Sequence, residues 1–529
     1  MKTEKRKQAY FVGGGLGSLA GASYLIRDGG FSGKDIHILE GLPVIGGSND
    51  GSGTPQKGFL CRGGRMLNEE TYENFWELFR SIPSLYQEGK SVTEEILEFD
   101  HAHPTHSRAR LINKEGKILD VSSMGFNNSD RMAMLRLLRT KETELDGLTI
   151  ADWFAKTPHF FETNFWYMWQ TTFAFQKWSS LFEFRRYMNR MIFEFSRIET
   201  LEGVTRTPYN QYESVILPIK KYLEGFGVDF SLKCTVTDLD FEEDNDITVT
   251  AIHCQDENGE GIIQLHEGDL CFVTNGCMTD NATLGDYNTP APFQANCPMS
   301  GDLWGKIAAK KSGLGNPKPF FEKANQTNWE SFTVTLKGNM LLKMIERYSK
   351  NIPGSGALMT FRDSNWLMSI VVAAQPHFTA QSKDETIFWG YGLYTDKKGN
   401  YVPKAMRDCT GEEMLTELLY HLHFDGQMEE IKKDVINVIP CMMPYIDSQF
   451  QPRKMSDRPK VVPNGSTNLA FISQFVEIPE DMVFTEEYSV RAARLAVYGL
   501  LHLDRDVCPV TPFHHDKKTL WKAVKTSFR

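Results

Sequence analysis

Residues 10–18 read Tyr-Phe-Val-Gly-Gly-Gly-Leu-Gly-Ser, and this stretch decides the fold of the first part of the chain. A β-branched and aromatic run enters a glycine loop there, and a second strand-like run over residues 36–39 ends at Glu40. Gly13 and Gly15 allow a tight turn and bring the backbone against a pyrophosphate at the N-terminus of the next helix, while an acid at the position of Glu40 accepts ribose hydroxyls. The order of these elements predicts a Rossmann-type dinucleotide site, with loop contacts from Gly13, Gly15, Leu16, Gly17 and Ser18.

A second glycine-rich segment indicates which dinucleotide binds. Gly46-Gly47-Ser48 follows the ribose acid, and the loop Arg62-Gly63-Gly64-Arg65 comes soon after it. Their amides and guanidinium groups suit a pyrophosphate and a flavin ring, so we expect FAD rather than NAD. The alternative is two solvent-exposed glycine turns. The further FAD contacts that we predict are Gly47, Ser48, Arg62, Gly63, Gly64, Arg65, Val236, Thr274, Asn275, Phe475 and Glu477.

The composition limits the class of protein. The chain has 529 residues, which is too long for one core, and a formal net charge of −10, which argues against a nucleic-acid partner. Its nine cysteines include no Cys-x-x-Cys pair, so we expect reduced thiols in a cytoplasmic protein and no metal site. No apolar run reaches the roughly 18 residues that a transmembrane helix needs.

The pattern along the chain predicts an α/β protein with several parts. We expect a discontinuous FAD-binding domain at 1–65, 206–285 and 456–505, a helical lid or insert at 66–205, a β-rich substrate domain at 286–455 and a C-terminal helical tail at 506–529. A single alternating strand is expected at 228–236, and buried strands at 270–274 and 469–472. Phe, Trp and Tyr make up 16 of the 43 residues from 153 to 195, against 12% of the chain. Such a cluster is typical either of packed core or of an apolar tunnel, and both remain open.

Several longer motifs resemble one known family. They include Gly58-Phe-Leu-Cys-Arg-Gly-Gly-Arg65, Phe184-Arg-Arg-Tyr187, Tyr209-Asn-Gln-Tyr-Glu-Ser214 and Phe484-Thr-Glu-Glu-Tyr-Ser489. This set is similar to the oleate hydratase family, once called myosin-cross-reactive antigens, and the similarity runs from the first strand to near residue 500. The resemblance implies an FAD-dependent hydro-lyase that adds water to the cis double bond of an unsaturated fatty acid. Because hydration involves no net redox change, the flavin would then act as an electrostatic and structural element.

The resemblance also implies a proton donor. Tyr187 occupies the place of the family tyrosine that protonates the alkene. A phenol can do this only in a dry pocket, beside a charge that stabilises the developing ions. Arg185 and Arg186 are neighbours in sequence, but adjacent side chains on a helix diverge and need not help. The alternative for Tyr187 is a core tyrosine with a satisfied hydroxyl.

A departure from the family occurs directly after the Arg-Gly-Gly-Arg loop. Most members carry glutamate there as the base that activates water, whereas this chain has Met66, although some members also carry methionine. A thioether cannot accept a proton. Glu69 and Glu70 lie about one turn further on and are the candidate replacements, with Glu69 the first. Acids at a helix start are, however, more often solvated and favoured by the helix dipole.

A second departure concerns the substrate. The family carries a threonine and an asparagine that grip the fatty-acid carboxylate just before Gln-Pro-His-Phe, and this chain has Val371 and Ala373 in that segment. Gln375 and His377 remain to meet the head group. A protonated histidine can supply a charge-assisted bond, but a lone histidine in a loop is more often structural.

The end of the chain suggests a second partner. Leu520, Trp521, Val524 and Phe528 recur at helical spacing among lysines. A basic helix with one apolar face is typical of proteins that lie on an anionic membrane, so the protein could be peripheral to the inner membrane face. A terminal helix that docks on its own protein gives the same pattern. The sequence leaves open whether the protein is a monomer or a homodimer.

Two other functions share the same fingerprint. One is a flavin oxidoreductase, such as an amine oxidase or a desaturase. The other is a non-catalytic flavoprotein that binds lipid, which the methionine at position 66 makes plausible. The products formed from oleate in labelled water would separate all three.

Overall fold

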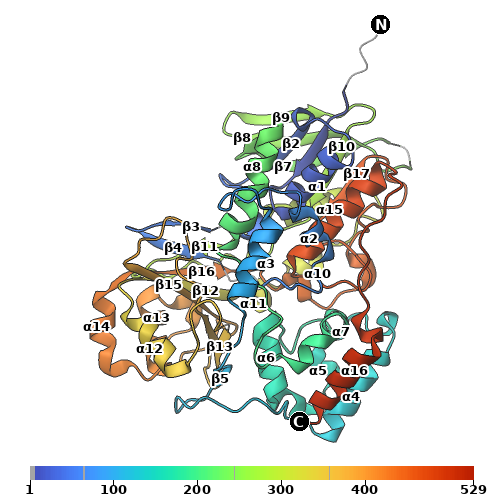
Figure 1. Ribbon diagram of the computed structural model, residues 1–529. Helices are drawn as coiled ribbons and strands as arrows, with labels where there is room; N and C mark the ends of the chain where they lie inside the picture. Colours follow the sequence, from blue (N-terminus) through green and yellow to red (C-terminus); the bar gives the residue numbers. More distant parts are fainter. Residues whose placement is uncertain (1–5, 50, 63–65, 244, 357) are drawn as a thin grey trace.

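A computed structural model describes residues 6–49, 51–62, 66–243, 245–356 and 358–529 (Figure 1). Five parallel strands form one sheet in the order β17-β10-β1-β2-β6, with β1 in the middle. This is the Rossmann arrangement, and the predicted α/β class is confirmed. The strands are β1 (Ala9–Val12), β2 (Ile36–Glu40), β6 (Asp229–Leu232), β10 (Leu270–Thr274) and β17 (Leu469–Ile472).

Three helices pack around this sheet. Helix α1 (Leu16–Arg27) contacts α15 (Glu486–Leu500) and α8 (Leu217–Phe226). The first half of α1 is buried and consists largely of small residues, including Ser18. A Cβ on Gly21 would lie 2.5 Å from the ring of Phe11, so the missing side chain lets the helix lie directly on β1. Small residues therefore set the distance between α1 and the sheet.

A second, larger sheet lies beside the first (Figure 1). Its order is β11-β16-β12-β15-β14-β13-β5, and only β5 and β13 pair in parallel. Alternate residues of β12 face opposite ways: Phe332 and Val334 enter a separate core, whereas Thr333 bonds to the backbone of Cys61. The strands are β5 (Leu111–Ile112), β11 (Thr283–Leu284), β12 (Trp329–Lys337), β13 (Leu358–Phe361), β14 (Met368–Val371), β15 (Glu385–Gly392) and β16 (Val435–Met443).

Two small sheets and the remaining helices complete the fold. A hairpin of β3 (Gly51–Thr54) and β4 (Gly58–Cys61) contacts the larger sheet, and β7 (Thr235–Phe241), β8 (Val249–Asp256) and β9 (Gly259–Gln264) form an antiparallel sheet. The other helices are α2 (Glu73–Phe79), α3 (Val92–Ala102), α4 (Asn128–Arg139), α5 (Ile150–Trp153), α6 (Asn164–Phe173), α7 (Leu181–Arg190), α9 (Met299–Lys310), α10 (Lys318–Phe321), α11 (Ala324–Thr327), α12 (Met340–Ser349), α13 (Gly411–His421), α14 (Met428–Lys433) and α16 (Lys517–Ser527).

One expected strand is divided in two. The sequence predicts a single strand over 228–236, but β6 ends at Leu232 and β7 begins at Thr235. Lys233 between them has a φ of 56°, a left-handed conformation that interrupts a strand. The chain therefore leaves the Rossmann sheet at Lys233 and enters the antiparallel sheet. The strands expected at 270–274 and 469–472 are found.

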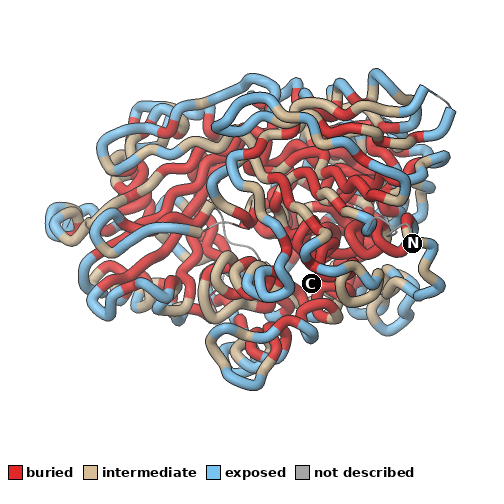
Figure 2. The backbone as a smooth tube through the Cα atoms, turned by 90° about the horizontal axis from the view of Figure 1, so that it is seen from above, coloured by how far each residue is buried: buried red, intermediate tan, exposed pale blue. Residues whose placement is uncertain are grey.

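Most of the aromatic cluster at 153–195 is core. Phe154 and Phe160 stack with ring centroids 3.7 Å apart, and Trp166 and Trp169 are buried among other rings. Figure 2 shows buried backbone running through the middle of the molecule, with exposed segments around it. The division into domains at 65, 205, 285, 455 and 505 stays a prediction. In the part of the chain that the structure describes, no helix has the length and apolar character needed to cross a membrane.

Candidate active site

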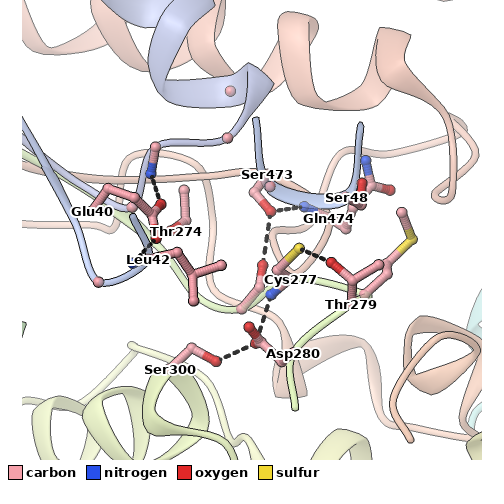
Figure 3. A pocket seen from close by; sticks show the side chains of 18 of the residues that line it. Glu40, Leu42, Ser48, Thr274, Cys277, Thr279, Asp280, Ser300, Ser473 and Gln474 are labelled. Carbon is pink, nitrogen blue, oxygen red and sulfur yellow. Dashed lines mark hydrogen bonds between the residues drawn. The ribbon is translucent and has the colours of Figure 1, made fainter. Parts of the chain in front are cut away.

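A cavity of about 370 Å³ lies at the carboxyl ends of the parallel strands (Figure 3). The last residues of β2 and β10, Glu40 and Thr274, line it. The turns after β1 and β17 contribute Gly13 and Ser473. In an open parallel sheet, ligands bind at this end, where connections leave the central strand in opposite directions. The position of the cavity is thus the one that the fold reserves for a cofactor.

The first glycine loop is built for close approach. Gly13 has a φ of 98°, and a Cβ there would lie 2.2 Å from Thr274 Oγ1. Thr274 Oγ1 donates to the carbonyl of Val12 at 2.7 Å, which holds the threonine in place. Gly15 is the N-cap of α1 and provides no side-chain cap. The first amide groups of the helix therefore face the cavity without a side-chain partner, which fits an anionic ligand such as a pyrophosphate.

The predicted ribose acid lies beside this loop. Glu40 Oε2 accepts a hydrogen bond from the amide of Gly14 at 2.6 Å, and Oε1 accepts one from Leu42 at 2.7 Å (Figure 3). Burial raises the pKa of Glu40, and these two amides partly offset that effect. Each carboxylate oxygen keeps a second lone pair, so the side chain can still accept hydroxyl groups.

The second glycine segment packs directly on the first. Gly15 and Gly46 form an isolated parallel bridge, and a Cβ on Gly47 would lie 3.2 Å from the Cα of Gly15. Arg62 lines the same cavity from the loop after β4. The remaining predicted contacts in that loop, Gly63, Gly64 and Arg65, lie outside the described residues.

The structure brings together ten of the predicted cofactor contacts. Four others lie elsewhere: Ser18 is buried within α1, Asn275 is buried, Phe475 packs against Trp304 and two phenylalanines, and Glu477 joins an ion-pair cluster. The residues that line the cavity are Gly13, Gly15, Leu16, Gly17, Glu40, Gly47, Ser48, Arg62, Val236 and Thr274.

Glu477 connects parts of the chain that are far apart in sequence. Its Oε1 accepts from Arg186 Nη2 at 2.6 Å, and its Oε2 accepts from Arg453 Nη2 at 2.7 Å. Burial raises the pKa of Glu477, but Arg453, Arg186 and Arg458 outweigh that effect and hold the pKa at about 2. Glu477 is therefore an ionised structural link between α7 and the segment that follows β17.

Sequence reasoning missed one side of the cavity. Cys277, Thr279, Asp280 and Ser300 line it (Figure 3). Asp280 Oδ2 accepts from the amide of Cys277 at 2.8 Å and from Ser300 Oγ at 2.5 Å, and burial raises its pKa. The available signal was the Asn275-Gly276 pair directly after β10, because the carboxyl end of a central parallel strand is where ligands bind.

A second cavity, of about 110 Å³, contains two of the predicted catalytic positions. Tyr187 and Met66 line it, together with aromatic side chains that include Phe173, Trp389 and Tyr391. Part of the aromatic cluster thus does face a cavity. Phe484, Thr485 and Glu486, at the start of α15, line both cavities. The two cavities therefore share one wall.

Tyr187 lies deep in the protein on α7. It is 2% exposed, and its hydroxyl donates to the carbonyl of Val483 at 2.5 Å. Burial raises the pKa of Tyr187 well above 10, so the phenol stays protonated. Arg186 is engaged with Glu142 and Glu477, and Arg185 lies 3.5 Å from Glu142. As expected from the helix geometry, both arginines pair with acids, whereas the Tyr187 hydroxyl bonds to a backbone carbonyl.

Met66 is held in the second cavity by backbone contacts. Its carbonyl accepts from the Tyr72 hydroxyl at 3.2 Å, and the next residue, Leu67, forms an antiparallel bridge with Thr205. Glu69 is exposed and lies 3.5 Å from His101, and Glu70 pairs with Arg197 at 2.7 Å. Neither of these acids lines the cavity.

Two other carboxylates do line the second cavity. Glu194 Oε1 accepts from Arg197 Nη2 at 2.6 Å and from Asn68 Nδ2 at 3.3 Å, and burial raises its pKa. Glu486 Oε1 accepts from Asn49 Nδ2 at 2.5 Å. Nothing in the local sequence placed Glu194 or Glu486 beside residue 66, because the three positions are far apart along the chain.

Comparison with known proteins places the chain in a family. The model of the MCRA family matches residues 6–498. The chain belongs to the MCRA family. A linoleate hydratase of Lactiplantibacillus plantarum is 41% identical over 99% of this chain and 99% of that protein. An oleate hydratase of Streptococcus pyogenes serotype M49 (strain NZ131) is 39% identical over 98% of this chain and 89% of that protein. The resemblance noted in the sequence is confirmed.

The fold of this MCRA-family chain is also found in a more distant protein. Cyclohexylamine oxidase from Brevibacterium oxydans IH-35A superposes with a TM-score of 0.56 at 14% identity, covering 94% of this chain and 99% of that one. This likeness concerns the fold alone.

The head-group residues predicted for this MCRA-family chain, Gln375 and His377, line neither of the two cavities. Gln375 Nε2 donates to the carbonyls of Ala373 and Ile387, and its Oε1 accepts from Ile387 and Gln381. The side-chain amide of Gln375 is therefore occupied by hydrogen bonds to nearby residues of the same segment. Burial and the charge of Arg206 lower the pKa of His377 to about 4, so its imidazole is neutral at pH 7.

The C-terminal helix of this MCRA-family chain docks and also leaves an apolar face exposed. Ala523 and Thr526 are buried where α16 packs on a short helical segment, η5 (Ile192–Ser196). Trp521 is 64% exposed and Phe528 is 65% exposed. Docking thus describes part of the helix, and the membrane interpretation stays a prediction.

Proposed function

We propose that the protein is an FAD-dependent hydratase of unsaturated fatty acids. One observation carries the proposal: the buried phenol of Tyr187 lines an apolar cavity that shares the wall 484–486 with a glycine-lined cavity at the end of a Rossmann sheet. The names of the two related hydratases support the same reaction class and the same substrate class. The reaction adds the elements of water across a cis carbon–carbon double bond.

The glycine-lined cavity is the proposed FAD site. The amides at the start of α1 would hold the pyrophosphate, Glu40 would accept ribose hydroxyls, and Arg62 would add positive charge. Gly47 belongs to the same cradle, because a side chain there would fill it. In a hydration the bound flavin supplies an electrostatic surface and gains or loses no electrons overall.

Tyr187 is the proposed proton donor. Its Oη proton passes to one alkene carbon, and a water oxygen bonds to the other. The proton that the water then releases finally replaces the one that Tyr187 gave up, so the sum is one water added. Because burial keeps the phenol protonated, the acid is available at neutral pH. The aromatic faces of Trp389 and Tyr391 line the same cavity and can stabilise positive charge that develops on the substrate.

Glu486 is the proposed acceptor of the water proton. It lines both cavities, so it lies where the alkene and the cofactor would meet. Glu194 is the weaker candidate because Arg197 donates to its Oε1 through both Nε and Nη2, which makes that oxygen less able to accept a proton. This assignment leaves Met66 with an apolar role beside the acyl chain.

The second cavity must widen to take a fatty acid. Its volume of about 110 Å³ is below the roughly 300 Å³ at which ligand pockets begin. Met66, Met191 and Met482 all line it. Unbranched thioether side chains repack easily, so these methionines are the parts of the wall that we expect to move when the acyl chain enters.

We further propose that the protein works in the cytoplasm at an anionic membrane surface. The exposed side chains Trp521, Val524 and Phe528 of the tail lie next to α4, where Met132 is 65% exposed. Arg131 joins the two helices, since its guanidinium lies 4.4 Å from the ring of Phe528. An apolar patch bordered by arginines and lysines suits a bilayer interface. The nine free cysteines support a reducing compartment.

One incubation tests the main proposal. The FAD-loaded protein is mixed with oleate or linoleate in water labelled with ¹⁸O, and the extracted acids are analysed by mass spectrometry. A hydratase gives a hydroxy acid that contains solvent oxygen and consumes no dioxygen. Dioxygen consumption would instead indicate an oxidase, and binding without any product would indicate a lipid carrier; either result overturns the proposal.

A further inference from the structure

Two arginines in this protein have buried guanidinium groups with opposite surroundings. Arg110 donates to four acceptors: Ile198 O at 3.3 Å, Leu358 O at 3.1 Å, Met168 O at 3.2 Å and Thr172 Oγ1 at 2.9 Å. In Arg206, Nε and Nη2 are buried, and neither has a hydrogen-bond partner among the described residues. Burial lowers the pKa of each arginine to about 10, so both stay charged at pH 7.

Arg206 lines the second cavity. Arg206 follows Thr205, whose antiparallel bridge to Leu67 sets Arg206 and Met66 on neighbouring strands. Both residues line the cavity. The backbone amide of Arg206 donates to Asp100 Oδ1 at 2.9 Å, which holds this part of the main chain in place. Among the described residues that line this cavity, Arg206 is the one with a positive charge.

An unpaired charge in such a place costs stability. A buried guanidinium that lacks acceptors loses its hydration without compensation, and removing one partner of a buried pair typically costs several kcal/mol. Arg110 shows how this chain avoids the cost where the arginine is structural. Arg206 has buried donors of the same kind without a partner beside a cavity that must widen to take its ligand. Two adjacent N–H groups match a carboxylate in a bidentate arrangement.

We propose that Arg206 binds the carboxylate of the fatty acid and thereby holds the acyl chain in the cavity with Tyr187. This inference rests on the proposed function for its substrate class. The two residues first predicted for this role cannot supply the charge. Gln375 uses its amide within its own loop, and His377 is neutral at pH 7. Arg206 is thus the cation that meets an anionic head group.

The test compares two ligands that differ only in the head group. Oleate and oleyl alcohol, both below their aggregation concentrations, are titrated into the FAD-loaded protein while tryptophan fluorescence is recorded. We expect the parent to bind oleate about tenfold more tightly than the alcohol, the size expected for a charge-assisted hydrogen bond. Arg206→Met should remove this preference, and Arg206→Lys should restore part of it. Arg108→Met removes an exposed arginine that does not line the cavity, and it should leave the preference unchanged.

Thermal melting without ligand separates a binding role from a structural one. Arg206→Met should melt at the same temperature as the parent or higher, because it removes an unpaired buried charge. Arg110→Met should melt lower, because it leaves carbonyl acceptors unmatched. A clear loss of stability in Arg206→Met would assign Arg206 to the structure and overturn the proposal.

Two results in the binding experiment also overturn it. One is a parent protein that binds the alcohol as tightly as oleate, which needs no variant to observe. The other is a preference for oleate that survives in Arg206→Met. Turnover gives an independent check, since loss of Arg206 should raise KM for oleate more than it lowers kcat. If the parent forms no hydroxy acid at all, the proposed function fails, whereas the binding comparison still decides the role of Arg206.

Discussion

Gly13 and Gly15 stand two residues apart and are glycines for different reasons. Gly13 has a left-handed φ, and any side chain there would collide with Thr274 inside the protein. Gly15 has an ordinary φ of −79°, and a Cβ there would meet only the Cα of Gly47, at 3.8 Å. Gly13 is therefore required by the fold. Gly15 is required by the proposed cofactor, which approaches the start of α1.

This difference gives a prediction. Gly15→Val should melt close to the parent when both lack flavin, yet retain little flavin on purification, because its side chain occupies the space of the pyrophosphate. Gly13→Ala should lower the melting temperature of the flavin-free protein. The measurements are the ratio of visible to ultraviolet absorbance and thermal unfolding. Full flavin content in Gly15→Val would show that the cofactor lies elsewhere.

Tyr187 provides the second prediction. Tyr187→Phe should keep the fold and the flavin and reduce hydration by about a hundredfold or more, the effect of removing a general acid. Tyr445→Phe is the matched control, since Tyr445 is also buried and hydrogen-bonded but does not line the cavity. Rates are measured as hydroxy acid formed per minute. Equal losses in both variants would indicate a general effect of removing a buried hydroxyl.

Glu486 and Met66 give the third prediction through rescue. Glu486→Gln should lower the hydration rate by about a hundredfold, and adding Met66→Glu should restore part of it, because the new carboxylate lies in the same cavity. In the parent background, Met66→Glu sets two acids close together, so each raises the pKa of the other and the acidic limb of the rate profile moves to higher pH. Glu69→Gln should change neither the hydration rate nor its dependence on pH, since Glu69 is exposed. Lack of any rescue would argue against water activation at this wall.

At the scale of elements, local signals located the Rossmann unit and failed where distant segments meet. Strands β1, β2, β10 and β17 and helix α1 were predictable from apolar runs and a glycine loop. The break between β6 and β7 was not, because the alternating pattern continues across Lys233 and only its φ of 56° reveals the turn. Arg206, Glu194 and Glu486 were also not predictable as one group, since only tertiary packing brings them together.

Helix α16 gives a prediction at this scale. Replacing Trp521, Val524 and Phe528 together by serine should reduce sedimentation with phosphatidylglycerol vesicles by about tenfold, because the exposed apolar face is lost while the buried Ala523 and Thr526 remain. Neutral phosphatidylcholine vesicles should bind the parent weakly, since the lysines then lack a partner. Leu85→Ser removes an exposed apolar side chain elsewhere and serves as the control. Unchanged sedimentation of the triple variant would assign α16 to docking alone.

At the scale of the whole molecule, one carboxylate joins the helical region to the Rossmann sheet. Glu477 follows β17 and pairs with Arg186 of α7 and with Arg453. The sequence suggested a cofactor contact there, because residues 471–477 resemble the terminal FAD-contacting segment of flavin oxidoreductases. The structure shows why such a pattern is ambiguous: a charged residue after a strand of the Rossmann sheet can face a ligand or a neighbouring segment, and only the fold decides which.

The low pKa of Glu477 gives a prediction about acid stability. A carboxylate whose folded pKa is about 2 stabilises the folded state above its unfolded pKa near 4.5 and loses that contribution as the pH falls toward 2. Glu477→Gln should therefore reduce the free energy of unfolding by about 3 kcal/mol at pH 7 and by clearly less at pH 3. Urea unfolding at the two pH values measures both differences. If the variant and the parent differed by the same free energy of unfolding at both pH values, ionisation of Glu477 would make no contribution to stability.

The wall formed by residues 484–486 has a consequence for how the two ligands affect one another. This segment at the start of α15 lines both cavities. A ligand that shifts it in one cavity therefore changes the binding of the ligand in the other. Cooperativity of this kind is reciprocal: if flavin tightens fatty-acid binding by some factor, the fatty acid must tighten flavin binding by the same factor. Substrate supply would then govern how much of the protein retains its cofactor, and starvation for unsaturated acids would leave it colourless.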